Sequence, residues 1–308
     1  MRTCGLHRVA EADGPFVSVY FDVTQHALLR WRAMRDQLEA HGAGEELLRP
    51  VDESVFADDA PPRGLAGRAL VVCREGILVD RYLPVPPTGY TARLGALPYL
   101  LPLVELSEPL VPHVVVRVDE HGADLRGVDS TGRPVAVATV GARRPEQRLD
   151  PVELADVARE ATSLVDRLGA PLLVLAGPLS CRRSLRVALP DRYHHLVVEV
   201  DGSPDREVPH LAGRADREGR RAVVRRFRDE TTRMAGGAVH GVADVLAALE
   251  EGRVETVLLS EPLVGGREVD GVRVDELVPL RAVEQRADVV LVGGAVRLHE
   301  DVGALLVP

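Results

Sequence analysis

The chain of 308 residues is long enough for two or three domains, and a hydrophobic share of 45% allows them substantial cores. Its 38 basic residues, all arginine, stand against 47 acidic ones, and the net charge of −9 excludes nucleic-acid binding through the overall field of the molecule. No apolar run approaches the ~18 residues of a membrane span, and the first residues lack the apolar segment of a signal peptide, so we expect a cytoplasmic protein.

The N-terminal third alternates between strand and helix patterns. Residues 16–21 alternate and are rich in β-branched and aromatic side chains, which predicts a strand. Residues 27–41 predict a helix that ends at Gly42. The apolar side chains expected on its inner face are Leu28, Trp31, Met34 and Leu38. Further along we predict a helix over 45–55, a hairpin over 69–80 and a short helix over 97–104.

The middle third begins with an antiparallel meander. Its three short strands are predicted at residues 113–119, 123–128 and 134–140. Asp150 and Pro151 are typical of the N-cap and first position of a helix, here predicted over 151–168. The elements expected after it are a buried strand over 171–176, a helix over 180–189, a strand over 195–200 and an arginine-rich helix over 217–234.

The C-terminal part again alternates helix and strand. Val242, Val245, Leu246 and Leu249 have the spacing of an amphipathic helix. Strands are predicted over 254–259, 287–292 and 302–306, and residues 264–277 indicate an inserted loop or hairpin. This alternation predicts a mixed α/β (α+β) fold. The composition at the boundaries favours three consecutive α/β domains, at residues 1–110, 111–235 and 236–308.

The sequence holds none of the common signatures of nucleotide-binding and hydrolytic enzymes, such as G-x-G-x-x-G, the Walker A loop, G-x-S-x-G or H-E-x-x-H. Cys4, Cys73 and Cys181 have the spacing neither of a zinc site nor of a disulfide framework. His194 and His195 are adjacent, so in a strand they would point to opposite faces and could not chelate one metal as a pair. We therefore expect neither a metal nor a cofactor.

Two groups of arginines are candidates for RNA contacts. Arg143, Arg144 and Arg148 lie around Gln147, in the connection between the meander and the helix at 151–168. Arg221, Arg225 and Arg228 share one helix face by their i, i+4, i+7 spacing, and guanidinium groups bind phosphates bidentately. The alternatives are an exposed connecting loop for the first group, and a solvated, salt-bridged face for the second.

Four stretches of the sequence carry a further signal through their order and spacing. They are residues 14–22 with 30–38; residues 67–70, 97–103, 114–119 and 122–124; residues 241–249 with 252–259; and residues 302–306. Together they resemble the bacterial archaeo-eukaryotic release factor-like family, which is related to Pelota, and within it the actinobacterial group that contains the hibernation factor Balon.

The resemblance implies a divergent N-terminal domain, a ribonuclease-H-like central domain and a C-terminal domain like the kink-turn RNA-binding ribosomal proteins. It also implies action at the ribosomal A site, where a Gly-Gly-Gln loop after the third central strand positions water for ester hydrolysis. No Gly-Gly-Gln exists in this sequence. The pair Gly236-Gly237 is followed by Ala238. The connection over 141–150 spans at most roughly 35 Å when extended. Gln147 is therefore not assigned the catalytic role.

We expect a non-catalytic release-factor homologue that binds the ribosome in the A-site region, in hibernation or stress, with no catalytic residue assigned. The expected partners are the ribosome and its RNA, with a translation elongation factor as a further candidate, and neither DNA nor a membrane. One alternative is a peptidyl-tRNA hydrolase in ribosome rescue that uses Gln147. The other is a protein-interaction scaffold away from the ribosome, in keeping with the net charge of −9.

Overall fold

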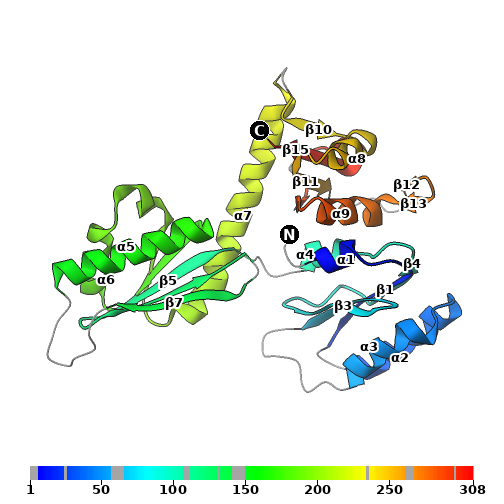
Figure 1. Ribbon diagram of the computed structural model, residues 1–308, viewed down its shortest axis with the longest axis horizontal. Helices are drawn as coiled ribbons and strands as arrows, with labels where there is room; N and C mark the ends of the chain where they lie inside the picture. The colour runs from blue at the N-terminus through cyan, green and yellow to red at the C-terminus, as the bar shows by residue number, and fades with distance from the viewer. Residues whose placement is uncertain are drawn as a thin grey trace. The chain divides into compact units, whose positions relative to one another are not determined.

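The computed structural model describes residues 6–23, 26–56, 66–106, 111–130, 132–140, 150–233, 236–260, 267–294 and 296–307 (Figure 1). The chain divides into two units. Unit 1 combines Met1–Glu108 with Ala222–Pro308, and unit 2 is Pro109–Arg221. Both units contain sheets covered by helices, which confirms the predicted mixed α/β class.

The N-terminal part of unit 1 is an antiparallel sheet with helices on both faces. Its strands are β1 (Phe16–Asp22), β2 (Gly67–Cys73), β3 (Gly76–Leu83) and β4 (Thr91–Gly95), in the order β3-β2-β1-β4. Because side chains alternate along β1, Val17, Val19 and Phe21 pack against α2 (Ala27–Ala40) and α3 (Glu45–Phe56). Phe16 and Tyr20 face the opposite way, toward α1 (His7–Ala10) and α4 (Leu101–Leu106).

The helix α2 confirms the element predicted over 27–41 and corrects its inner face. Trp31, Met34 and Leu38 are buried as expected. Leu28 is 46% exposed, contrary to the prediction. At 100° per residue, Leu28 points about 90° away from the middle of the face that the other three define. It therefore lies at the margin of the buried stripe rather than within it.

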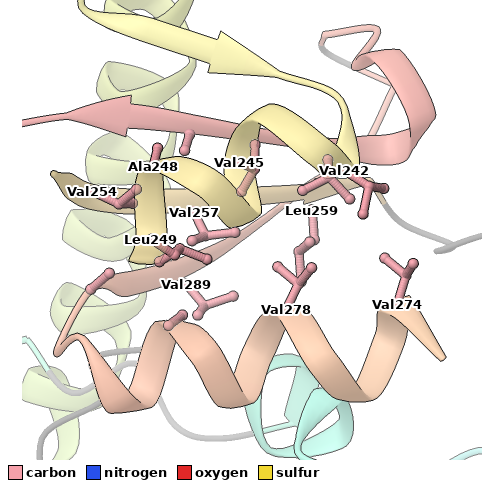
Figure 2. Packing of buried hydrophobic residues seen from close by; sticks show 14 of the residues in the cluster. Val242, Val245, Ala248, Leu249, Val254, Val257, Leu259, Val274, Val278 and Val289 are labelled. Atoms are coloured by element: carbon pink, nitrogen blue, oxygen red, sulfur yellow. The ribbon is translucent and has the colours of Figure 1, made fainter. Parts of the chain in front are cut away.

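The C-terminal part of unit 1 is a second four-stranded sheet. Its strands are β10 (Ala238–His240), β11 (Val254–Ser260), β14 (Asp288–Val292) and β15 (Val302–Leu306), in the order β10-β15-β11-β14, with β11 and β14 parallel. One face packs against α8 (Val242–Glu250) and α9 (Val274–Glu284), and Figure 2 shows Val245, Val257 and Val278 between these elements. On the other face, Leu258 and Leu305 contact Phe227 near the end of α7 (Pro204–Thr231).

The segment 264–277 is only in part the loop or hairpin that its sequence indicates. The hairpin is formed by β12 (Glu268–Val269) and β13 (Val272–Arg273). Asp270 and Gly271 form its turn with positive φ values of 51° and 78°, which an Asp-Gly pair accommodates readily. The helix α9 follows directly and was not predicted. Its buried residues lie on several faces, so it lacks the single apolar stripe by which a surface helix is recognised.

The two sheets of unit 1 share a buried boundary. The helix α4, which follows the N-terminal sheet in sequence, contributes Val104 to the core of the C-terminal sheet. In return, α9 contributes Val283 to the core that contains Tyr20. These reciprocal contacts explain why segments from the two ends of the chain form one unit.

Unit 2 contains a five-stranded mixed sheet. Its strands are β5 (His113–Val118), β6 (Ala123–Val128), β7 (Pro134–Val140), β8 (Leu172–Ala176) and β9 (Val197–Val200), in the order β7-β6-β5-β8-β9, with β5, β8 and β9 parallel. The predicted meander is confirmed as β5–β6–β7. The helices α5 (Pro151–Leu168) and α6 (Leu179–Ala188) cover one face. Val208 and Leu211 of α7 pack against the other.

Two predictions for unit 2 were wrong. The strand predicted over 195–200 begins only at Val197, as β9, because His195 belongs with His194 to the short 3-10 helix η1 (Asp191–Leu196). The arginine-rich helix begins at Pro204 rather than at residue 217. Pro209 and Gly213 lower the helix propensity of the added stretch, and its packing on the sheet outweighs that cost.

Candidate nucleic-acid interface

The first group of predicted RNA contacts lies in the connection between β7 and α5. Arg143, Arg144 and Arg148, together with Gln147, fall outside the described residues. The strand that leads into this connection is the edge strand of its sheet. Its outward side chains are exposed, among them Val135 at 49% and Val137 at 77%.

The residue at the far end of the same connection is Asp150, which caps α5. Its Oδ1 accepts hydrogen bonds from the backbone N–H groups of Val152 and Glu153, both at 2.8 Å. In return, Glu153 accepts from the backbone N–H of Asp150 at 3.0 Å, which completes a capping box. Asp150 is thus the predicted helix cap, and its carboxylate is occupied with the first turn of α5.

The second group lies on α7, with all three side chains exposed. The boundary between the units falls directly after Arg221, so Arg221 belongs to unit 2 and Arg225 and Arg228 belong to unit 1. Within the described part of the chain, the side chains of Arg221 and Arg225 make no hydrogen bond or ion pair. The helical spacing of these residues is confirmed, while their role in RNA binding stays a prediction.

Other arginines of α7 are neutralised by acidic partners. Nε of Arg220 lies 2.8 Å from Oδ2 of Asp216, one helical turn away. Nη1 of Arg226 lies 2.7 Å from Oε1 of Glu255, and this hydrogen bond raises the pKa of the Arg226 guanidinium. For these two arginines the alternative of a salt-bridged face holds. The arginines of α7 therefore divide into paired and unpaired ones.

The earlier start of α7 adds basic residues that the sequence reasoning did not count as candidates. Arg206 and His210 are exposed on the part of the helix before residue 217. Their signal was present in the sequence as spacings of four residues from 206 to 210 and from 210 to 214. It was missed because the helix was predicted to begin too late.

Ion pairs also occupy the carboxyl ends of the parallel strands in unit 2. Arg182 of α6, with a side chain only 5% exposed, contacts Asp201 and lies 3.6 Å from Glu199. Arg117 of β5 donates to Asp205 at the start of α7, at 2.6 Å. Among the described residues, no three His, Cys, Asp or Glu side chains are placed to hold a metal ion. Nor does any helix in the described ranges have the length and apolar character to cross a membrane.

The meander, the capped α5 and α7 all fall within residues 112–240, and this segment matches the model described as Bacterial archaeo-eukaryotic release factor family 2. Residues 112–240 are therefore similar to the bacterial archaeo-eukaryotic release factor family, in agreement with the resemblance in the sequence.

Relatives along the full chain are more distant. An uncharacterized protein of Mycobacterium tuberculosis H37Rv, Rv2629, is 29% identical, with 99% of this chain and 96% of the relative covered. Archaeal Pelota, in a model of its ribosome-bound state with ABCE1, is 17% identical over 99% of this chain and 93% of its own, with a TM-score of 0.42. The archaeal translation termination factor aRF1 is 16% identical over 99% and 98%, with a TM-score of 0.27. The similarity to the release factor family rests on the match over residues 112–240.

Proposed function

We propose that this protein is a non-catalytic release-factor homologue that binds the ribosome in the A-site region. The observation that carries the proposal is a match of residues 112–240 to a release factor family in a chain without a Gly-Gly-Gln sequence anywhere in its 308 residues. Where release factors carry that loop, this chain has only residues 141–149 between the end of β7 and the cap of α5. The function we propose is therefore ribosome binding without hydrolysis of peptidyl-tRNA.

The RNA contacts in this proposal are arginines from both candidate groups. Arg143, Arg144 and Arg148 would act from the connection after β7, and Arg221, Arg225 and Arg228 from α7. Guanidinium groups suit this role because their planar array of donors matches two phosphate oxygens at once. The net charge of −9 requires such contacts to be local rather than spread over the surface.

The setting we propose is an idle ribosome in hibernation or stress, in the cytoplasm, with a translation elongation factor as a candidate partner. A factor that occupies the A site without hydrolysing peptidyl-tRNA would protect the site and keep it silent. In this proposal the three segments 1–110, 111–235 and 236–308 act as successive domains of the factor.

Sedimentation of the tagged full-length protein with ribosomes from growing and starved cells tests the proposal. We expect co-sedimentation with the ribosomal fractions, enriched in starved cells and lost at high salt. Absence from every ribosomal fraction at low salt would contradict ribosome binding and favour the scaffold alternative.

Peptide release from stalled ribosomal complexes separates binding from hydrolysis. We expect the unmodified protein and the Gln147→Ala variant to give the same background release. Release by the unmodified protein that disappears in Gln147→Ala would instead establish a peptidyl-tRNA hydrolase.

A further inference from the structure

The first half of α7 carries a row of basic side chains on one face, entirely within unit 2. The row consists of Arg206, His210, Arg214, Arg217 and Arg221, and is called the arginine stripe below. Successive members are four, four, three and four positions apart in sequence. At 100° per residue, all five lie within an arc of about 80° on the helix, and at 1.5 Å per residue they extend over roughly 22 Å.

The side chains of the arginine stripe are exposed to solvent and have no acidic partner among the described residues. All five residues are exposed. Across the described ranges of the chain, none of their side chains takes part in a hydrogen bond or an ion pair. Arg220, just outside the stripe, shows the contrast, because Asp216 holds it at 2.8 Å. Glu207 and Glu218 border one margin of the stripe without interrupting it.

The opposite side of the same helix is anchored to the sheet. Val208 and Leu211 pack with Val115, Val174 and Val200. The ion pair between Arg117 and Asp205 fixes the start of the helix to β5. The stripe is therefore presented by a helix whose rotation about its own axis is set by packing, so the spacing of its charges is preorganised.

We propose that the arginine stripe binds the phosphate backbone of RNA, an inference that rests on the proposed ribosomal function. Four guanidinium groups in a line suit a continuous chain of phosphates, to which each donates bidentately. An acidic protein surface is the competing partner. It is less suited because a straight row of about 22 Å with one charge per turn demands a partner whose negative charge is equally regular and extended.

Binding of the full-length protein to a mixed-sequence RNA duplex and to ribosomes, over a range of salt concentrations, tests the inference. The test variant is Arg214→Gln with Arg217→Gln. The matched control is Arg167→Gln with Arg183→Gln, which removes two exposed arginines of unit 2 from α5 and α6 and changes the net charge equally. Glutamine preserves helix propensity, and thermal unfolding of both double variants checks that each is folded.

We expect the stripe variant to bind the duplex at least about tenfold more weakly than the unmodified protein at about 0.1 M salt. The magnitude of the slope of log K against log salt concentration should decrease by about 1.4–1.8, the value for two lost phosphate contacts. The control should stay within about twofold of the unmodified protein. Equal weakening of both variants, or of neither, overturns the inference, as does binding to polyglutamate that exceeds binding to RNA. If the unmodified protein and the stripe variant sediment with ribosomes alike, the stripe inference fails while the proposed function stands. If the unmodified protein does not sediment with ribosomes, the proposed function itself fails.

Discussion

The guanidinium group of Arg93 on β4 lies 2.9 Å from Oε1 of Glu276 on α9, although the two residues are 183 positions apart in the sequence. The same group stacks on the ring of Tyr99, with Cζ 3.5 Å from the ring centroid. The backbone N–H of Tyr99 in turn donates to Oγ of Ser18 at 3.0 Å. Arg93 thus ties the two sheets of unit 1 together where two carboxylates of the first turn of α9, Asp275 and Glu276, are nearly buried.

Replacing Arg93 by methionine should lower the free energy of unfolding of unit 1 by about 1–2 kcal/mol, because Glu276 then loses its nearest counter-charge in a position with little solvent. Urea unfolding measures the change. The control is Arg49→Met, whose ion pair with Glu53 is 72% exposed on both sides and should cost less than about 0.5 kcal/mol. A double-mutant cycle with Glu276→Gln that gives no coupling energy would show that the two residues do not stabilise each other.

Removing the N-cap of α5 should lower the free energy of unfolding of unit 2. Asp150→Ala loses the two hydrogen bonds that Oδ1 accepts from the backbone N–H groups of Val152 and Glu153, and we expect a cost of about 1 kcal/mol in urea unfolding. Ser163→Ala, at an exposed position inside the same helix, is the control and should be neutral or slightly stabilising. A loss in the control as large as that in Asp150→Ala would mean that capping is not the cause.

Gly303 on β15 is required by the closeness of α7. A Cβ atom added at this position would lie 2.8 Å from the ring of Phe227. Gly303→Ala should therefore cost about 1–3 kcal/mol of stability in urea unfolding through overpacking. Phe227→Leu in the same chain should recover part of that loss, because the smaller side chain leaves room for the methyl group. Full stability of Gly303→Ala alone would contradict the tight packing.

The carboxylate of Glu300 should stabilise the C-terminal sheet in a pH-dependent way. Its Oε2 accepts from the backbone N–H of Val242 at the start of α8, and Oε1 lies 2.6 Å from Nη1 of Arg267. The backbone hydrogen bond first, and Arg267 second, hold the pKa of Glu300 below its ordinary value of 4.5. A lowered pKa means that the stabilisation is present above about pH 4.5 and is lost as the pH falls through the pKa of the folded state.

Melting curves of Glu300→Gln against pH check this prediction. The variant should melt below the unmodified protein at pH 7, and the two curves should converge under acid conditions, where Glu300 is itself neutral. Glu250→Gln, at the exposed end of α8, is the matched control and should show no such convergence. A difference between Glu300→Gln and the unmodified protein that is the same at every pH would contradict the role of the charge.

The elements that could be predicted from the sequence are those with local causes. The strand at Phe16–Asp22, the meander and the buried strand at Leu172–Ala176 follow from patterns of a few adjacent residues. The ends of α5 follow from Asp150, Pro151 and Gly169, because caps act on the nearest turn only. The resemblance to the release factor family could also be read from the order of short stretches along the chain, and residues 112–240 match a model of that family.

The elements that were missed depend on distant partners. The helix α9 is covered on more than one side, by the core of its own sheet and by the core beside the N-terminal sheet, so no amphipathic stripe marks it. The start of α7 is stabilised by the contacts of Val208 and Leu211 with strands far away in sequence. Because this start was predicted too late, Arg206 and His210 were missed as part of a basic face.

The sequence by itself determined the α/β class, the resemblance to the release factor family and the absence of a Gly-Gly-Gln sequence, because these depend on which residues are present and in what order. It also placed arginines at helical spacing. Only the tertiary structure decided which arginines pair with acidic residues distant in the sequence and which face the solvent, since Glu255 pairs with Arg226 from 29 positions away while the stripe has no acidic partner among the described residues. The pair of Arg220 with Asp216, by contrast, is local to one helical turn. The physical reason is that burial and long-range pairing are set by contacts between residues far apart in the chain, and periodicity along one helix does not contain them.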